Sequence, residues 1–153
     1  MKTVTLNNGV VMPQIGYGVY QVSPSECERC VSDALAVGYR MIYTAQAYAN
    51  EQGVGAAVKK SGIPRDELFL VSKIWIANYG YEKAKKSIDE SLRKLGTDYI
   101  DLIFSISLSV TVMEHIAQWK KPTRKANSVQ SESATSIPTI LSTLPAMSRL
   151  FRL

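Results

Sequence analysis

The strongest constraint on the fold of this chain is a repeat of strand and helix patterns with a period of 30 residues. Apolar, strand-like segments open at Tyr39, Phe69 and Tyr99, and one amphipathic helix pattern lies between each pair. A strand–helix–strand unit places its two strands parallel in one sheet, because the helix carries the chain back to the starting edge. Parallel strands with helices between them leave two architectures, a doubly wound sheet and a (β/α)8 TIM barrel.

Turn and cap residues set the expected bounds of the elements. Residues 3–12 contain two β-prone runs around Asn8-Gly9, a dipeptide typical of tight β-hairpins. Strands are predicted over residues 15–20, 39–45, 68–75 and 99–104. Helices are predicted from a Ser-x-x-Glu capping box at Ser23 to a stop at Gly38, over residues 51–60, and over residues 81–95. The predicted fold is therefore a hairpin followed by four strands with three helices between them.

The glycines at positions 16 and 18 bear on the choice between the two architectures. A doubly wound dinucleotide-binding fold carries G-x-G-x-x-G between its first strand and its first helix. Gly16 and Gly18 instead lie inside a predicted strand, and the third glycine is missing. We interpret the pair as a place where another part of the chain approaches the backbone closely, so the sequence favours the barrel.

The two cysteines lie one helical turn apart. Cys27 and Cys30 have the spacing of a redox or zinc pair, but the chain has no second pair and its only histidine is His115. Packing on a helix face is favoured over chemistry, and no metal site is predicted. The cysteine content, the lack of an apolar run near the roughly 20 residues of a membrane span and the lack of a leader-like N-terminus predict a cytoplasmic protein.

The net charge of +5 is unevenly distributed along the chain. Residues 1–102 carry 12 Lys and Arg against 11 Asp and Glu, whereas residues 103–153 carry 6 against 2. The basic excess belongs to the last third, which contains none of the nine glycines. A nucleic-acid-binding module would rest on this segment alone, so neither nucleic acid nor a membrane is expected as a partner.

Polar side chains follow two successive predicted strands, at the edge where the catalytic groups of barrels gather. Tyr43, Thr44 and Tyr48 come at the end of one strand, and Lys73 and Trp75 at the end of the next. Taken alone, Lys73 is explained by a buried ion pair or by an aliphatic chain that extends its ammonium to solvent. Tyr48 taken alone is explained as a loop tyrosine whose ring packs against the protein. Together they indicate a proton donor beside a cation, because a nearby positive charge favours the ionised form of a phenol.

Four stretches of this chain resemble one enzyme family. They read LNNGVVMPQIGYGVYQV, GYRMIYTAQAYANEQGVGAAVK, GIPRDELFLVSKIW and SLRKLGTDYIDL. These stretches are similar to the aldo-keto reductases, in their bacterial, diketogluconate-reductase-like branch, and the likeness runs from Leu6 to Phe104. The resemblance implies the N-terminal half of a (β/α)8 barrel, NADPH as cofactor, a small-molecule carbonyl substrate, and a catalytic tetrad of Asp, Tyr, Lys and His.

The resemblance gives roles to particular residues at the strand ends. Tyr48 matches the tyrosine that protonates the carbonyl oxygen, and Lys73 matches the lysine that assists that tyrosine. Tyr20 and Trp75 match the aromatic residues that form the walls of the substrate pocket. Gly18 and Val19 match the backbone that approaches the nicotinamide end of the cofactor.

Two positions depart from the family's tetrad. Tyr43 stands where the family has its aspartate, so Lys73 loses its carboxylate partner. Ile106 stands where the family has its histidine. The resemblance therefore implies that half of the tetrad is missing.

Beyond residue 104 the resemblance is absent from the protein sequence but can be recovered in its codons. When the reading frame is shifted by one base, the codons that can encode residues 130–137 permit the sequence I-G-V-S-N-F-Y. This sequence contains the family's sixth-strand motif I-G-V-S-N-F. The shifted frame also permits a histidine across Ser105 and Ile106. We interpret residues 1–104 as a partial reductase domain and residues 105–153 as an irregular tail produced by a frameshift.

Two functions stay open on the sequence alone. One is an NADPH-dependent reductase of aldehydes and ketones by descent, truncated and inactive as written, because half of the tetrad and most of the cofactor site are not encoded. The alternative is a non-catalytic half-barrel that associates with itself through open sheet edges.

Overall fold

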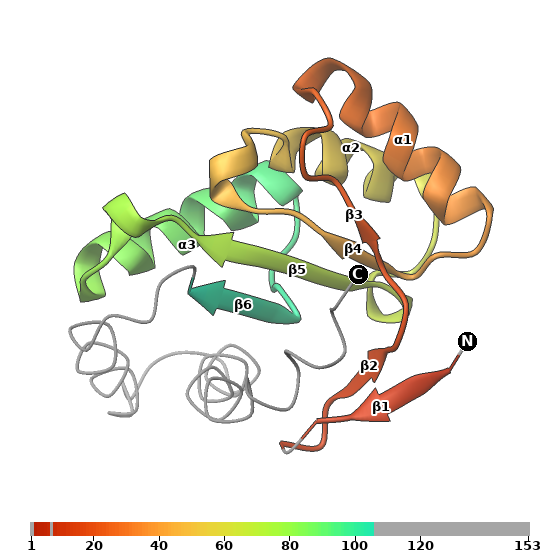
Figure 1. The fold of residues 1–153 in the computed structure, drawn as a ribbon, viewed down its shortest axis with the longest axis horizontal. Helices are drawn as coiled ribbons and strands as arrows, with labels where there is room; N and C mark the ends of the chain where they lie inside the picture. Colours follow the sequence, from red (N-terminus) through yellow and green to blue (C-terminus); the bar gives the residue numbers. More distant parts are fainter. Residues whose placement is uncertain (1, 7, 106–153) are drawn as a thin grey trace.

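The structure is a computed structural model that describes residues 2–6 and 8–105. This part of the chain contains a two-stranded sheet and a four-stranded sheet (Figure 1). The predicted tail, residues 105–153, lies outside the described residues apart from the backbone of Ser105. The match of Ile106 to the family's histidine lies outside them as well.

The N-terminal hairpin consists of β1 (Thr3–Thr5) and β2 (Val11–Pro13), which pair antiparallel. A hydrogen bond of 2.8 Å from the Leu6 N–H to the Val10 carbonyl closes its turn. Gly9 has a φ of 86°, a conformation that glycine adopts without a steric penalty. The hairpin is thus confirmed at its predicted place.

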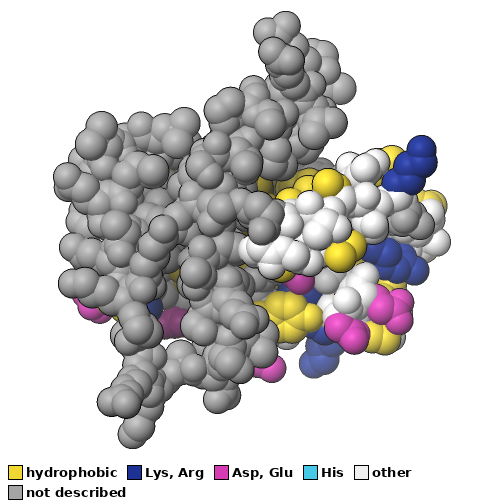
Figure 2. All heavy atoms as spheres, turned by 90° about the horizontal axis from the view of Figure 1, so that it is seen from below, with side chains coloured by type: hydrophobic (Ala, Val, Ile, Leu, Met, Phe, Trp, Pro, Cys, Tyr) yellow, Lys and Arg dark blue, Asp and Glu magenta, His cyan; other side chains and the backbone are white. Residues whose placement is uncertain are grey.

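Figure 2 shows one face of the molecule. Where the described residues are visible on this face, hydrophobic and charged side chains are interspersed.

The larger sheet contains four strands in the order β3-β4-β5-β6, each parallel to its neighbours. The strands are β3 (Tyr17–Gly18), β4 (Met41–Tyr43), β5 (Phe69–Ile74) and β6 (Leu102–Ser105). The strand β6 starts at Leu102 instead of residue 99. Before it, the Tyr99 carbonyl accepts hydrogen bonds from the side chains of Arg65 and Thr97. The parallel pairing confirms the predicted series of βα units.

Three α-helices connect the strands of this sheet and cover one of its faces (Figure 1). They are α1 (Pro24–Ala36), α2 (Glu51–Ser61) and α3 (Tyr81–Leu95). Three short 3-10 helices lie in the connections: η1 (Gln46–Tyr48), η2 (Arg65–Glu67) and η3 (Ile76–Asn78). Ser23 is the N-cap residue of α1, as predicted, but the side-chain bonds of the predicted capping box are absent. The Ser23 hydroxyl donates to the Glu26 carboxylate at 2.9 Å and caps no backbone N–H of α1.

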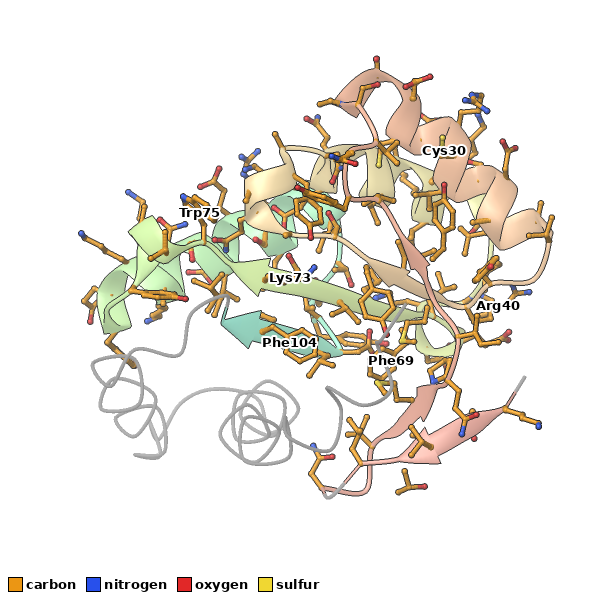
Figure 3. The ribbon with its side chains drawn as sticks, viewed as in Figure 1. Cys30, Arg40, Phe69, Lys73, Trp75 and Phe104 are labelled. Carbon is orange, nitrogen blue, oxygen red and sulfur yellow. The ribbon has the colours of Figure 1, made fainter. Side chains whose placement is uncertain are left out.

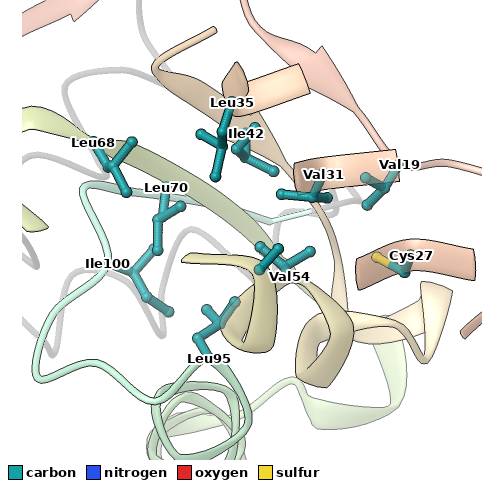
Figure 4. Packing of buried hydrophobic residues seen from close by; sticks show 11 residues of the cluster. Val19, Cys27, Val31, Leu35, Ile42, Val54, Leu68, Leu70, Leu95 and Ile100 are labelled. Atoms are coloured by element: carbon teal, nitrogen blue, oxygen red, sulfur yellow. The ribbon is translucent and has the colours of Figure 1, made fainter. Parts of the chain in front are cut away.

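The main hydrophobic core lies between the helices and the sheet (Figure 4). Its buried residues are Val19, Cys27, Val31, Leu35, Ile42, Val54, Ala57, Leu68, Leu70, Leu95 and Ile100. Cys27 belongs to this core, and burial raises the pKa of its thiol to about 11. Cys30 is half-buried on the same helix, and both thiols are free. The structure therefore places the cysteines in helix packing, as the sequence predicts.

The buried stripe of α3 is partly polar. Apolar residues at helical spacing along α3 are Ala84, Ile88, Leu92 and Leu95, but Ile88 and Leu92 are only half-buried, whereas Ser87 and Ser91 are buried. Both buried hydroxyls have polar partners: the Ser87 hydroxyl donates to the Ala84 carbonyl, and the Ser91 hydroxyl accepts from the Gln46 side chain.

A second apolar cluster lies on the opposite face of the sheet. Its buried residues are Met12, Met41, Phe69, Val71 and Leu102, with Leu6, Tyr43 and Phe104 packed against them. A sheet with apolar residues on both faces is typical of parallel strands in α/β barrels and doubly wound folds. The described chain thus has the hairpin, strands and helices predicted for the N-terminal half of a (β/α)8 barrel.

Candidate active site

The predicted catalytic pair lies at one edge of the sheet. Tyr48 ends η1, the 3-10 helix that follows β4, and Lys73 lies near the end of the neighbouring strand β5. Trp75 follows directly after β5 (Figure 3). Because the carboxyl ends of parallel strands meet at the same edge, side chains 25 residues apart in the sequence come together here.

The Lys73 ammonium contacts two oxygen atoms and one aromatic ring. Its Nζ donates to the Thr44 carbonyl at 3.0 Å and to the Tyr48 hydroxyl at 3.2 Å. The same atom lies 4.8 Å from the centre of the Tyr48 ring, within the range of a cation–π interaction. Among the described residues, no acidic side chain forms a salt bridge with Lys73. The half-buried cation therefore has neutral partners in this part of the chain.

Tyr43 occupies the position matched to the family's aspartate. Its half-buried side chain packs against the second apolar cluster, and burial raises the pKa of its phenol. The phenol is therefore uncharged at neutral pH and cannot replace a carboxylate. The ring also lies where a Cβ at Gly16 would collide with it, so a larger residue at position 16 would require the Tyr43 ring to shift. This close contact confirms one of the two approaches predicted from the Gly-x-Gly pair.

The predicted pocket residues lie in the loops beside this pair. The rings of Tyr20 and Tyr48 are 5.1 Å apart between centroids, and Tyr20 is 66% exposed. Trp75 is 43% exposed. A Cβ built at Gly18 would meet no atom within 4 Å, so the second predicted approach has no partner among the described residues. Val19 is fully buried, and its N–H donates to the Tyr43 carbonyl at 3.0 Å.

Asn50 is a buried polar residue that the sequence reasoning missed. Its side-chain oxygen accepts a hydrogen bond of 2.8 Å from the Thr44 hydroxyl. Its side-chain nitrogen donates to the carbonyls of Val19 at 2.9 Å and Val22 at 3.0 Å. The carboxamide thus joins the loop after β3 to the loop after β4. The only sequence signal was an asparagine directly before a predicted helix, which reads as a helix cap.

Gln46 is the second polar residue that the sequence reasoning missed. Its side-chain oxygen accepts from the Trp75 N–H at 3.0 Å and from the Asn78 side chain at 2.9 Å. Its side-chain nitrogen donates to α3 at Ser87 and Ser91, at 3.1 Å and 3.2 Å. Nothing local in the sequence indicates these contacts, because the partners lie 29 to 45 residues away.

The described residues contain neither a metal-binding cluster nor a membrane-spanning helix. No group of three His, Cys, Asp or Glu side chains among the described residues could hold a metal ion. None of the helices in this part is long and apolar enough to cross a membrane. The site at the carboxyl ends of β4 and β5 contains a tyrosine, a lysine and aromatic loop residues. A tyrosine hydroxyl that is bonded to an ammonium can donate a proton to a ligand oxygen.

Comparison with known proteins identifies the family. The family model described as "Aldo/keto reductase family" matches residues 6–120. The chain belongs to the aldo/keto reductase family, which makes it a relative of oxidoreductases and confirms the resemblance seen in the sequence. The match ends at residue 120, beyond the predicted end of the resemblance at Phe104.

Individual relatives support this assignment. The methylglyoxal reductase of Escherichia coli (strain K12) is 42% identical over 118 residues, which are 76% of this chain and 42% of that protein. A crystal structure of an aldo/keto reductase from Brucella melitensis has 53% identity and a TM-score of 0.66, over 67% of this chain and 39% of the other. A Bombyx mori aldo-keto reductase in complex with NADP has 33% identity and a TM-score of 0.64, over 67% and 36%. The chain thus spans less than half of the length of these relatives.

Proposed function

We propose that this chain carries the proton-donating part of an NADPH-dependent carbonyl reductase site. The observation that supports the proposal most directly is the 3.2 Å hydrogen bond between Lys73 Nζ and the Tyr48 hydroxyl at the carboxyl edge of the sheet. The substrate class is small aldehydes and ketones, in line with the methylglyoxal reductase among the relatives. Membership of an enzyme family favours this function over the alternative of a self-associating, non-catalytic half-barrel.

The chemistry of the pair follows from its geometry. The Tyr48 hydroxyl gives its proton to the carbonyl oxygen as negative charge develops there, and the Lys73 ammonium stabilises the tyrosinate that remains. The Thr44 carbonyl holds the ammonium in place at 3.0 Å. Tyr20 and Trp75, both partly exposed beside the pair, would form apolar walls for the substrate.

The cofactor would be held at the end of β3, where Gly18 is the last strand residue and Val19 follows it. Gly18 is exposed, and no atom lies within 4 Å of the place that a Cβ would occupy there. The nicotinamide ring could therefore approach the Gly18 backbone without a clash. Val19 supports this backbone by being buried and bonded to β4. When bound, NADPH supplies the hydride that reduces the carbonyl carbon. The Bombyx mori relative, whose structure contains NADP, supports this choice of cofactor.

We also propose that the chain as written has little or no reductase activity. Tyr43 puts an uncharged phenol where the family carries its aspartate, so Lys73 has lost an acidic partner from this position. Loss of one positioned group of an acid–base site typically lowers the rate by about 10²- to 10⁴-fold. A frameshift after residue 104 would account for the second departure, at Ile106. A cytoplasmic location and the lack of nucleic-acid or membrane partners stay predictions.

Activity measurements test this proposal directly. The purified chain is assayed with NADPH against methylglyoxal, glyoxal and a panel of diketones, by following the absorbance of the reduced nicotinamide. We expect no measurable turnover from the chain as written. Turnover should arise when Tyr43→Asp is combined with restoration of the reading frame after codon 104, and Tyr48→Phe should abolish it.

Two outcomes would contradict the proposal. Turnover by the unchanged chain that disappears with Tyr48→Phe would show that the chain is an active reductase despite Tyr43. Turnover in the restored chain that survives Tyr48→Phe would show that Tyr48 is not the proton donor. Sequencing of the gene around codons 103–106 tests the frameshift separately.

A further inference from the structure

Gln46 joins three segments of the chain around the proposed site. It is the first residue of η1, whose last residue is Tyr48. Its carboxamide has two donor hydrogens and an oxygen with two lone pairs, and all four positions are used. Two of its bonds go to the segment of Trp75 and Asn78, and two go to α3. A side chain whose hydrogen-bonding capacity is filled by distant segments is not a solvent-facing loop residue.

In the part of the chain that the structure describes, core packing contributes little to two of the segments that Gln46 joins, η1 and η3. Neither η1 nor η3 contains a buried residue. Trp75 is 43% exposed and its neighbour Ile76 is 51% exposed, so core packing does not fix the turn after β5. Hydrogen bonds must therefore supply much of the orientation of this turn relative to η1. Gln46 provides the bond to the Trp75 N–H itself, at 3.0 Å.

We infer that Gln46 is a positioning residue, which fixes the substrate wall formed by Trp75 relative to the proton donor Tyr48. The inference rests on the proposed function for the identity of the wall, but the positioning can be measured without turnover. The side-chain oxygen holds the Trp75 turn, and the side-chain nitrogen fastens η1 to α3. Loss of the Gln46 side-chain oxygen removes the hydrogen bond that orients the Trp75 turn. Loss of the two Gln46 N–H donors alone leaves that bond in place.

The test uses the full chain with Trp119→Phe, which leaves Trp75 as the only tryptophan. Amide hydrogen exchange at Trp75 and acrylamide quenching of its fluorescence are compared in Gln46→Leu and Gln46→Glu. Gln52, which is exposed on α2, provides the matched control Gln52→Leu. Urea unfolding of each variant separates a change in the turn from a change in global stability.

We expect Gln46→Leu to increase exchange at the Trp75 amide by roughly fivefold or more, since one hydrogen bond of about 1 kcal/mol is lost. Quenching of Trp75 should increase as well. Gln46→Glu keeps an oxygen acceptor and should leave the Trp75 amide within about twofold of the parent, as should Gln52→Leu.

The inference is overturned if Gln46→Leu folds and leaves exchange and quenching at Trp75 unchanged. If Gln46→Leu does not fold, Gln46→Glu decides: a Trp75 amide as protected as in the parent supports the role of the oxygen, and an unprotected one refutes it. Neither readout uses cofactor or substrate. A failure of the proposed reductase function would therefore leave this result interpretable.

Discussion

Replacing Arg65 by methionine should destabilise the sheet more than any replacement of a surface arginine. The Arg65 guanidinium donates to the Asp101 carboxylate at 2.6 Å, to the Tyr99 carbonyl at 2.9 Å and to the Leu68 carbonyl at 2.8 Å. It also bonds the Thr97 hydroxyl and stacks 4.0 Å over the Tyr99 ring. The arginine thus ties η2 to the segment that leads into β6.

The expected magnitude follows from burial and from the partner left behind. The side chains of Arg65 and Asp101 are only 20% and 17% exposed. Removal of one member of a buried pair typically costs about 3–5 kcal/mol, because the other charge stays buried without its partner. Residual solvent contact and the remaining bond from the Leu70 N–H to the Asp101 carboxylate reduce this cost. We therefore expect a loss of about 2–4 kcal/mol for Arg65→Met.

The assay is urea unfolding of the full chain, followed by far-ultraviolet circular dichroism. Arg29→Met is the matched control, since Arg29 pairs with Glu26 and Asp33 on the surface of α1 and its side chain is 66% exposed. This control should change the free energy of unfolding by less than about 0.5 kcal/mol. Equal unfolding midpoints for Arg65→Met and Arg29→Met would refute the structural reasoning about the Arg65 contacts.

Three further predictions test the packing of the core. With a thiol pKa of about 11, Cys27 should be roughly one-thousandth ionised at pH 8 and should react with a disulfide reagent only after unfolding, while Cys30 reacts in the native protein. Gly55→Ala should lower the urea midpoint despite the better helix propensity of alanine, because the new Cβ would lie 2.7 Å from the main-chain oxygen of Lys94. Thr44→Val should lower the free energy of unfolding by about 1–2 kcal/mol in the same assay, because the buried side-chain oxygen of Asn50 loses its donor. An unchanged midpoint would contradict this hydrogen bond.

The order and type of the elements could be predicted from the sequence because their signals are local. The Asn8-Gly9 turn, the stop at Gly62 and the stop at Gly96 are set by backbone conformations that a few neighbouring residues determine. The 30-residue repeat then requires parallel strands. The side-chain bonds of the capping box at Ser23 were not predictable, because side-chain rotamers decide whether the Ser23 hydroxyl bonds the Glu26 carboxylate or a backbone N–H. The predicted ends of the strands differ from the observed ends for a related reason, because the pairing of each end depends on the neighbouring strand.

The candidate pair of Tyr48 and Lys73 was also predictable, because parallel strands bring their carboxyl ends to one edge. The sequence alone therefore determined the fold class, the family and the edge at which the chemistry would lie. Only the tertiary structure showed that the Thr44 carbonyl holds the Lys73 ammonium, and that Gln46 and Asn50 join the surrounding loops. These contacts connect residues 28 to 45 positions apart, except for the local bond between Thr44 and Asn50. A carboxamide has no periodicity or spacing that indicates its partners, so its bonds are decided by how the elements pack.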